Sequence, residues 1–325
     1  MCGIAGLWSV DESAGWRRSA NALQASIAHR GPDGQGVLGI GEDGSVRRVD
    51  TVEALPQGSW MGVLLHRRLS IVDVEGGAQP MSNEDGRIWL IFNGEIYNHA
   101  SIRAELIGLG HHFATKADTE VIVHGWEHWG PGLLERLNGI YAFALLDLRT
   151  GRDLWLARDP AGVKPLYLGV NGHTWWFASE LAAARQSALA GTEIDPAGLA
   201  EYLVYRFVPS PRTVFKHAWK VPPGHYCRID ERSPAVPEFR PFRYARSGTS
   251  APRSTAEWGD AIGSGLRDAV RRQLMSDVPV GSLLSGGVDS TIVTQSGVLM
   301  IKKTGIFLQL SKPRYKNTAA IIRYI

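Results

Sequence analysis

Two neighbouring pairs of strand-like stretches between residues 140 and 179 constrain the fold most. "IYAFALLDL" and "DLWLARD" flank the turn "RTGR", and "PLYLGV" and "HTWWFAS" flank an Asn-Gly turn. Apolar and aromatic runs joined by such turns predict antiparallel hairpins. The earlier stretches "GVLLHRRLSIVD" and "RIWLIFNGEIYN" also have strand character. The chain up to about residue 225 is therefore predicted to be rich in antiparallel strands.

Helical patterns are fewer in this part and stronger after it. Residues 13–29 carry apolar side chains at helical spacing, and Asp118-Thr119-Glu120 marks the start of a helix through "VIVHGWEHW". A second amphipathic helix is predicted over 255–277. The short apolar strand "VPVGSLLS", the turn "GGVDS" and a new helix follow it. This order is typical of the opening of a nucleotide-binding α/β domain.

Length and composition favour two domains in a soluble cytoplasmic protein. The 325 residues are 44% apolar, contain two cysteines and show no signal-peptide pattern or long apolar span. After Asp289 the chain has six basic residues and no acidic one, and the remainder has 29 basic against 32 acidic residues. The basic character belongs to the tail, so it argues neither for a nucleic-acid partner nor for a membrane.

Cys2 follows the initiator methionine directly. Removal of Met1 would leave Cys2 with a free α-amine, whose pKa of about 8 suits it as a base for the thiol, with a pKa of about 8.5. One residue then supplies both a nucleophile and its base. The alternative is that a small residue simply follows methionine, and the dipeptide alone does not decide between the two.

Seven motifs in order give the chain a family resemblance. "MCGIAGLW", "HRGPDGQG", "LLHRRLSIVDVEGGAQPM", "NGEIYNH", "ADTEVI", "LNGIYAFALLD" and "RDPAGVKPLY" resemble the glutaminase domain of glutamine-hydrolysing asparagine synthetases. These are class II amidotransferases with an N-terminal nucleophile. The resemblance implies an α+β fold of four αββα layers over 2–228 and the start of an ATP-pyrophosphatase domain at 256–296. The Pro-, Ser- and Arg-rich stretch between them predicts a linker at 229–255, and the residues at 297–325 form an atypical basic tail that does not resemble the family.

The resemblance also implies roles for individual residues. Cys2 would attack the glutamine carboxamide, while the Asn93 side chain and the Gly94 N–H hold the oxyanion. Arg68 would bind the substrate carboxylate, and Asp118 its ammonium with help from Glu95. Taken alone, Asn-Gly is usually a turn and an aspartate before a helix is usually a cap. The resemblance favours the catalytic roles.

"SGGVDS" resembles the pyrophosphate-binding loop of ATP-pyrophosphatases. The resemblance implies that backbone and hydroxyl donors of this loop contact ATP and that Asp289 assists Mg²⁺; the loop residues are Ser285, Gly286, Gly287 and Ser290. ATP, Mg²⁺ and aspartate enter only as co-substrates of the family reaction, which makes asparagine. Only 35 residues follow Ser290, and a complete domain of this class needs several further βα units.

The histidines do not predict a metal site. His124 and His128 are four residues apart on the expected helix, and His111-His112 precede it, but the sequence shows no third ligand in a known pattern. We therefore expect no protein-bound metal. Cys227 reads as a buried, inert thiol.

We expect this chain to hydrolyse glutamine without making asparagine. One alternative is ammonia supply for amidation of another carboxylic acid, and another is a non-catalytic remnant or binding subunit. A homodimer is one assembly compatible with the family resemblance.

Overall fold

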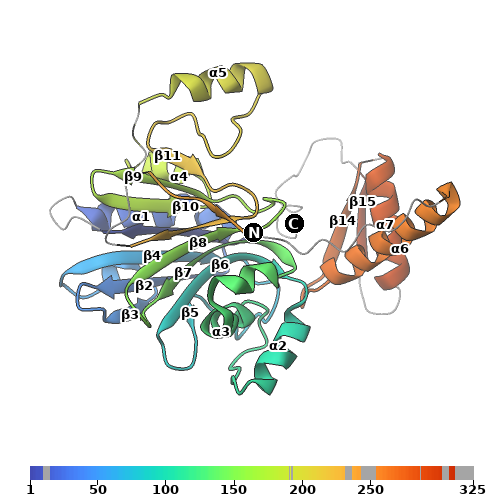
Figure 1. Cartoon of the computed structure of the whole chain (residues 1–325), viewed down its shortest axis with the longest axis horizontal. Coiled ribbons are helices and arrows are strands. Elements are labelled where there is room, and N and C mark those ends of the chain that lie inside the picture. Colours follow the sequence, from blue (N-terminus) through green and yellow to red (C-terminus); the bar gives the residue numbers. More distant parts are fainter. Residues whose placement is uncertain are drawn as a thin grey trace. The chain divides into compact units, whose positions relative to one another are not determined.

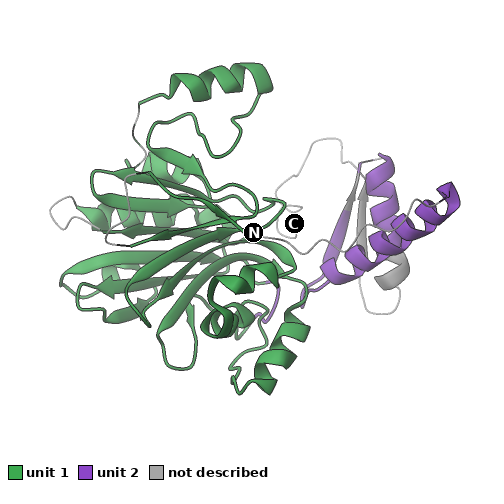
Figure 2. Ribbon diagram, in the orientation of Figure 1, with its two compact units in different colours: residues 1–70, 75–245 green, residues 71–74, 246–325 purple. Residues whose placement is uncertain are grey.

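The computed structural model describes residues 1–9, 15–189, 191, 193–230, 236–242, 254–285, 287–301 and 307–311. The chain forms two compact units, which Figure 2 shows in different colours. Unit 1 comprises residues 1–70 and 75–245, and unit 2 comprises residues 71–74 and 246–325. Each unit is considered separately below.

Unit 1 contains a seven-stranded sheet, here called sheet A, which includes β1 (Gly3–Trp8). The strands of sheet A pair antiparallel, and β1 lies between the five-residue β10 (Thr174–Ala178) and the nine-residue β4 (Trp60–Arg68). The remaining strands are β9 (Tyr167–Asn171) and β11 (Ala218–Lys220) beyond β10, and β2 (Gly34–Gly41) and β3 (Val46–Val49) beyond β4. The first strand of the chain is therefore central in its sheet.

A second, six-stranded antiparallel sheet, sheet B, is built around one long hairpin. β6 (Ile88–Ile96) pairs with β7 (Gly139–Asp147) over nine residue pairs, and β7 pairs in turn with β8 (Asp153–Arg158). The sheet is completed by β5 (Met81–Ser82) at one edge and by β12 (His225–Ile229) and β13 (Arg240–Pro241) at the other.

Unit 1 has four layers, with one buried cluster of side chains between each pair of neighbouring layers. Figure 1 labels the helices and strands that form these layers. The central cluster joins residues of both sheets, among them Leu64 of sheet A and Ile91 of sheet B. A second cluster packs α1 (Trp16–Ser26) and α4 (Leu181–Gln186) on sheet A, and a third packs α2 (His99–Gly108) and α3 (Glu120–Trp129) on sheet B. The order is helix, sheet, sheet, helix, as the sequence resemblance implies.

The alternation of side chains along each strand explains how two sheets contribute to three buried clusters. Successive side chains of a strand point to opposite faces, so each buried strand supplies two layers. In β4, Leu64 belongs to the central core while Val63 and Leu65 belong to the core under α1. In β6, Ile91 faces the central core and Leu90 and Phe92 face the core under α3.

Shorter helices complete unit 1. Three 3₁₀ segments cover Ala28–Arg30, Val52–Ala54 and Gly130–Glu135. Helix α5 (Pro196–Tyr205) begins with an Asp195 cap, whose side chain accepts a hydrogen bond from the Ala197 N–H at 3.0 Å.

Unit 2 has a β-α-β arrangement after a long helix. Helix α6 (Thr255–Gln273) starts with a capping box between Ser254 and Glu257. Strand β14 (Val280–Leu284), helix α7 (Val288–Ile301) and strand β15 (Phe307–Ser311) follow, and the two strands pair in parallel. A parallel pair joined through a helix is the element from which nucleotide-binding α/β sheets are built.

Several predictions from the sequence are confirmed. Both hairpins form, β7 with β8 and β9 with β10, but the second turn is made by Gly172 and His173, because Asn171 still pairs with Thr174 in the strand. The helices after residues 13, 118 and 255 are present as α1, α3 and α6, although residues 13 and 14 lie outside the described part. Helix α7 extends to Ile301 and β15 follows it, so part of the segment read only as a tail has regular structure. No helix among the described residues is long and apolar enough to cross a membrane.

The central core gives a first test of this architecture. Leu64→Ala removes fully buried methyl groups between the sheets, so we expect the free energy of unfolding to fall by about 2–5 kcal/mol. Leu203→Ala on α5, where the side chain is 72% exposed, should change it by less than about 0.5 kcal/mol. Urea unfolding followed by tryptophan fluorescence measures both, and equal effects would contradict the placement of Leu64.

Candidate active site

Strand register brings four of the predicted site residues to one end of the space between the sheets. In the β1–β4 pairing Gly3 lies opposite Arg67 and Ile4 opposite His66, so continuing the register places Cys2 beside Arg68. Asn93 and Glu95 share the face of β6 that Ile91 presents to the central core. Residues far apart in the sequence therefore meet where the apolar core gives way to polar side chains.

The backbone of the N-terminal segment is fixed by side chains as well as by the sheet. The Arg30 Nε–H donates to the carbonyl oxygen of Cys2 at 3.0 Å, and Arg30 is itself paired with Glu180 at 2.8 Å. The Ile4 N–H donates to Ser179 Oγ at 3.0 Å, and the Ser179 N–H donates to the Ile4 carbonyl at 2.8 Å. Chain ends usually fray. Here the terminal residues are held.

The Cys2 thiol lies against the backbone of Leu69. The Leu69 N–H donates to Sγ at 3.4 Å, and the thiol can donate to the Leu69 carbonyl oxygen at 3.6 Å. Burial raises the pKa of the Cys2 thiol, while the Leu69 N–H, the chain's α-amine and Arg68 act in the opposite direction. The thiol is thus favoured as the neutral species until a base removes its proton.

Asn93 is buried, and its position is set by the residue before it. His66 Nε2–H donates to the Phe92 carbonyl at 3.2 Å, and the Phe92 N–H donates to Gln79 Oε1 at 2.7 Å. Burial lowers the pKa of His66 to about 3, so its imidazole is neutral at physiological pH. The Asn93 Nδ2 has no hydrogen-bond partner in the structure. A buried amide donor without a partner is suited to bind a ligand oxygen.

Gly94 is required by the close packing of β6 on β7. A Cβ atom at this position would lie 2.2 Å from the Ile140 carbonyl oxygen and 2.7 Å from the Tyr141 Cα. Both atoms belong to the backbone, so neither can move aside cheaply. The Asn-Gly pair is therefore not a reverse turn, as the dipeptide alone suggests, but part of a continuous strand.

Glu95 and Asp118 form an acidic pair, in which Asp118 is buried and Glu95 is half-buried. Burial, then repulsion from Asp118, raises the pKa of Glu95 to about 8. Burial raises the pKa of Asp118 to about 6. The hydrogen bond that its Oδ2 accepts from the Ile96 N–H at 2.7 Å acts in the opposite direction and lowers the pKa. Thr119 is the residue at the N-cap of α3, and it makes no side-chain cap bond. The carboxylates are charged only at a cost unless a cation lies beside them.

Sequence reasoning did not assign a role to Lys164, although it lies in the quoted motif "RDPAGVKPLY". Its side chain is buried, and burial lowers the pKa of its ammonium despite the attraction of Glu95 and Cys2. A lysine in a loop reads as a solvated surface residue, and only the fold places it beside the acidic pair. A buried cation next to Glu95 helps that carboxylate to ionise.

The loop that carries Lys164 is held by its own neighbours. Asp159 is fully buried and accepts hydrogen bonds from the backbone N–H groups of Ala161, Val163 and Lys164 at 3.0–3.1 Å. The guanidinium of Arg158 donates to the Lys164 carbonyl at 2.7 Å. This network fixes the path of the loop and thereby the root of the lysine side chain.

The two arginines at the end of β4 differ in surroundings. Arg68 is half-buried and contributes to the electrostatics of Cys2. Arg67 points to the opposite face of β4, where its Nε–H donates to the Gln24 carbonyl of α1 at 3.2 Å and burial lowers its pKa. Arg67 is therefore not a freely solvated surface residue, because α1 covers this face of sheet A.

In unit 2 the predicted phosphate loop joins β14 to α7. Ser285 Oγ and Ser290 Oγ lie 2.9 Å apart, and Ser290 Oγ also donates to the Gly287 carbonyl at 3.1 Å. Asp289 is in the first turn of α7. Gly286 lies outside the described residues. Two hydroxyls at the start of a helix suit a phosphate group, which needs hydrogen-bond donors and a positive helix end.

Comparison with known proteins decides the family. The family model described as "Glutamine amidotransferase domain" matches residues 1–240, and the model described as "Asparagine synthase" matches residues 261–298. The chain belongs to the glutamine amidotransferase domain family. The amidotransferase match covers all of sheet A and sheet B except the last residue of the edge strand β13, so it includes the strands β1, β4 and β6 that position the site.

Among curated proteins, this amidotransferase chain is similar to glutamine-hydrolysing asparagine synthetases. It is 34% identical over 307 residues to asparagine synthetase 1 of Bacillus subtilis and 36% identical over 310 residues to a putative asparagine synthetase of Mycobacterium tuberculosis. The alignments cover 90% of this chain but 43% and 45% of those relatives. The chain thus spans less than half the length of the curated relatives it matches.

Among solved structures, the chain resembles the glutamine phosphoribosylpyrophosphate amidotransferase of Bacillus subtilis. The TM-score is 0.55 at 20% identity, covering 99% of this chain and 70% of that one. This likeness concerns the fold, and it agrees with the four-layer N-terminal-nucleophile arrangement expected from the sequence.

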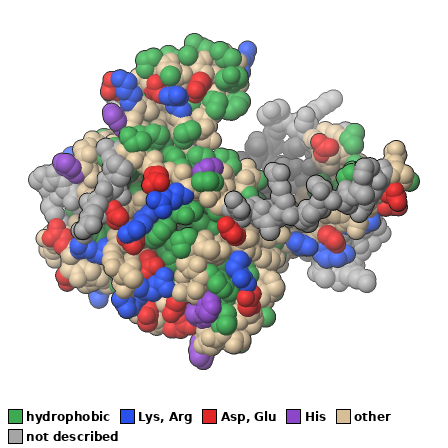
Figure 3. All heavy atoms as spheres, in the orientation of Figure 1, with side chains coloured by type: hydrophobic (Ala, Val, Ile, Leu, Met, Phe, Trp, Pro, Cys, Tyr) green, Lys and Arg blue, Asp and Glu red, His purple; other side chains and the backbone are tan. Residues whose placement is uncertain are grey.

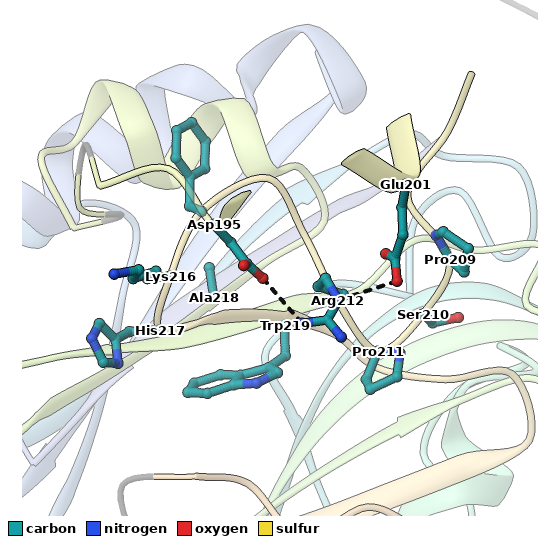
Figure 4. A pocket seen from close by; sticks show the side chains of 11 residues that line it. Asp195, Glu201, Pro209, Ser210, Pro211, Arg212, Lys216, His217, Ala218 and Trp219 are labelled. Carbon is teal, nitrogen blue, oxygen red and sulfur yellow. Dashed lines mark hydrogen bonds and ion pairs between the residues drawn. The ribbon is translucent and has the colours of Figure 1, made fainter. Parts of the chain in front are cut away.

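The amidotransferase domain also has a hollow of about 460 Å³ at the edge strand β11, which Figure 4 shows with its lining side chains. Arg212 crosses it and pairs with Asp195 at 3.2 Å and Glu201 at 3.3 Å. Exposed apolar side chains gather on nearby α5, where Figure 3 shows them in green. In sheet A this edge is separated from β1 by β9 and β10, so the hollow is distinct from the Cys2 site.

The acidic pair predicts a dependence of stability on pH. The pKa of Glu95 is raised in the folded chain, so the stability contributed by its protonated form is present below pH of about 4.5 and is lost as the pH rises through about 8. Glu95→Gln mimics the protonated side chain. We therefore expect the variant to melt at a higher temperature than the unchanged protein at pH 8.5, with a smaller difference at pH 5.

Glu53→Gln provides the matched control, because Glu53 is exposed. Its melting temperature should follow that of the unchanged protein at both pH values in calorimetry. A Glu95→Gln variant that is less stable at pH 8.5 than at pH 5, relative to the unchanged protein, would contradict the burial of this carboxylate.

Proposed function

We propose that this chain hydrolyses the side-chain amide of glutamine to glutamate and ammonia, with Cys2 as the nucleophile. The proposal rests on one observation: the Cys2 thiol, the buried Asn93 amide and the acidic pair of Glu95 and Asp118 lie together at one end of the sheets. The family match and the names of the similar synthetases support it.

The proposed first step requires that Met1 is removed, so that the amine of Cys2 is free. A free α-amine has an ordinary pKa of about 8, so part of it is neutral at physiological pH and can accept a proton. The amine takes the thiol proton, and the thiolate attacks the carboxamide carbon of glutamine. A tetrahedral intermediate forms, and its oxygen carries the negative charge.

In the following steps the Asn93 amide and the Gly94 N–H donate to that oxyanion. The protonated α-amine transfers its proton to the leaving nitrogen, and the C–N bond breaks to release ammonia. Water then attacks the glutamyl thioester with the amine as base, the C–S bond breaks, and glutamate leaves. Cys2 recovers its proton, so the cycle is balanced.

Recognition of glutamine is assigned to the charged groups around this thiol. Arg68 binds the α-carboxylate through its guanidinium, and Asp118 with Glu95 binds the α-ammonium. The substrate cation offsets the cost of ionising the buried pair, so binding and ionisation favour each other. Lys164 assists Glu95 electrostatically without contacting the reacting amide.

For unit 2 we propose the beginning of a synthetase domain, within the boundaries 229–255 for the linker and 256–296 for the domain start. The hydroxyls of Ser285 and Ser290 would hold a phosphate of ATP, with Mg²⁺ assisted by Asp289. ATP would supply activation of a carboxylate, aspartate in the similar synthetases' reaction.

We also propose a cytoplasmic location, because a nucleophilic thiol has to stay reduced. A homodimer is the assembly to test.

Substitutions at the thiol and at the oxyanion donor test the mechanism. Cys2→Ala should abolish glutamate release, and Asn93→Ala should lower kcat by about 10²–10³-fold, since one donor to the oxyanion is lost. Coupled glutamate dehydrogenase assays measure both, and Asn98→Ala serves as an amide control outside the buried site. Intact mass must show loss of Met1; full activity with Met1 retained would overturn the role of the amine.

The acidic pair predicts how glutamine binding varies with pH. Free Asp118 and Glu95 have raised pKa values, about 6 and about 8, so lowering the pH from 8.5 to 5.5 protonates the groups that bind ammonium. We expect KM for glutamine to rise over this range, by up to about tenfold per pH unit. In Asp118→Asn the KM should be high at all pH values, and an unchanged profile in this variant would exclude Asp118 from the ammonium site.

The synthetase reaction is separated from glutamine hydrolysis by its product. We expect the purified chain to release glutamate and to form no asparagine from aspartate, ATP and Mg²⁺, because the described part of unit 2 provides one phosphate loop on two strands. Amino-acid analysis of the same reaction measures both products. ATP-dependent asparagine formation would disprove this limit, and release of neither product would disprove the glutaminase assignment.

A further inference from the structure

A cluster of two histidines and two glutamates lies on unit 1, apart from the Cys2 site. Glu84 follows β5, His111 follows α2, and His124 and Glu127 are three residues apart on α3. One ligand atom from each of these four residues can be chosen so that all lie within 4.8 Å of one another. Three separate segments of the chain thus bring metal-binding groups to one point.

The distances within the cluster suit a shared ion. His124 Nδ1 is 3.0 Å from Glu84 Oε2, and His111 Nδ1 is 3.6 Å from Glu84 Oε1 and 3.9 Å from Glu127 Oε2. Four tetrahedral ligands at about 2.0–2.2 Å from a zinc ion would place their donor atoms about 3.3–3.6 Å apart. The four donor atoms now lie within 4.8 Å of one another, so binding an ion would draw the side chains closer together, with Glu84 exposed and Glu127 half-buried.

His124 carries the strongest indication that a ligand is needed. The residue is 1% exposed, and within the described part of the chain Nδ1 has no hydrogen-bond partner, although Glu84 Oε2 is 3.0 Å away. On the other side of the ring, Nε2 lies 3.5 Å from Glu120 Oε1. With the proton on Nε2, the lone pair of Nδ1 faces a carboxylate oxygen. Two acceptors at this distance repel each other unless a cation lies between them.

Glu120 is built to fix that tautomer. It is buried, and its oxygens accept hydrogen bonds from the Ala114 N–H at 2.6 Å and the Thr115 hydroxyl at 2.6 Å. The Thr115 N–H also donates to Glu120 Oε2 at 2.8 Å, so the carboxylate is held in place beside His124. A carboxylate behind a ligating histidine is the usual partner that orients the ring in metal sites.

The two outer carboxylates are also held from behind. The His112 N–H donates to Glu84 Oε1 at 2.9 Å, and Asn83 Nδ2 donates to Glu127 Oε2 at 2.8 Å. Both carboxylates are therefore oriented by groups that are not themselves ligands.

We propose that Glu84, His111, His124 and Glu127 form a binding site for a first-row divalent cation, with Zn²⁺ as the best-suited ion. Two imidazole nitrogens with two carboxylates suit zinc better than the harder cations Mg²⁺ and Ca²⁺, which prefer oxygen ligands alone. The ion would link α3 to the segments after β5 and α2, so its role is to stabilise unit 1. No metal site is predicted from the sequence, because the positions of Glu84 and Glu127 relative to the histidines match no known metal-binding motif.

Zinc titration of the full, untagged chain tests the site. The titration uses EDTA-treated protein with the Cys2→Ala substitution, so that the thiol contributes no metal binding. Isothermal calorimetry with ZnCl₂ should show one equivalent bound with micromolar or tighter affinity. His111→Ala and Glu84→Gln should each weaken binding by more than about tenfold, while His128→Ala and His112→Ala, both at exposed neighbours, should leave it unchanged.

Cobalt absorption gives a second readout that does not depend on enzyme activity. Bound Co²⁺ should give the intense visible bands of a four-coordinate ion, and Glu84→Gln, a conservative change at an exposed position, should remove them. Absence of Zn²⁺ binding at about 100 μM would overturn the proposal and leave His124 as a protonated partner of Glu84. Equal affinity in His111→Ala and the control variants would also overturn it.

Discussion

The pairing of β1 with β4 and β10 is the constraint on which the rest of unit 1 depends. It holds the second residue of the chain beside Arg68 at the end of a central strand. Because sheet B covers the same face, the thiol meets Asn93 and Glu95 of β6 without any loop having to place them. Sites on paired strands are more rigid than sites on loops. In this site the thiol is also held by a hydrogen bond from the Leu69 backbone N–H.

Removing the polar groups around Cys2 from water costs free energy, and nearby hydrogen bonds offset part of this cost. Two carboxylates, a lysine and a thiol are removed from water within one region, and burial is the largest influence on the pKa of each. Arg158 and Asp159 compensate by satisfying backbone groups of the loop around Lys164. Functional sites commonly store such unfavourable desolvation, because a charged substrate relieves it on binding.

Most of the fold was accessible from the sequence because local patterns and the motif order agree. The hairpins, α1, α3, α6 and the strand before the "GGVDS" turn follow from alternation, turns and helical spacing. The residues missed are those whose role depends on tertiary contacts. Lys164 looks like a surface lysine until the loop folds inward, Arg67 becomes covered by α1, and Glu84 joins the histidines only after β5 and α3 pack together. Asn93-Gly94 looked like a turn because dipeptide preferences ignore a nine-residue strand pairing.

The central place of β1 also sets an order of events during synthesis. Residues 3–8 leave the ribosome first, yet their partners are residues 60–68 and 174–178. A growing chain can form the β1–β4 pair early, but the other edge of β1 stays open until more than half of the sequence has been made. During that interval this edge of β1 lacks the strand that completes its hydrogen bonding. Sheet A, which carries Cys2 at the end of β1, is therefore complete only after residues 174–178 have been made.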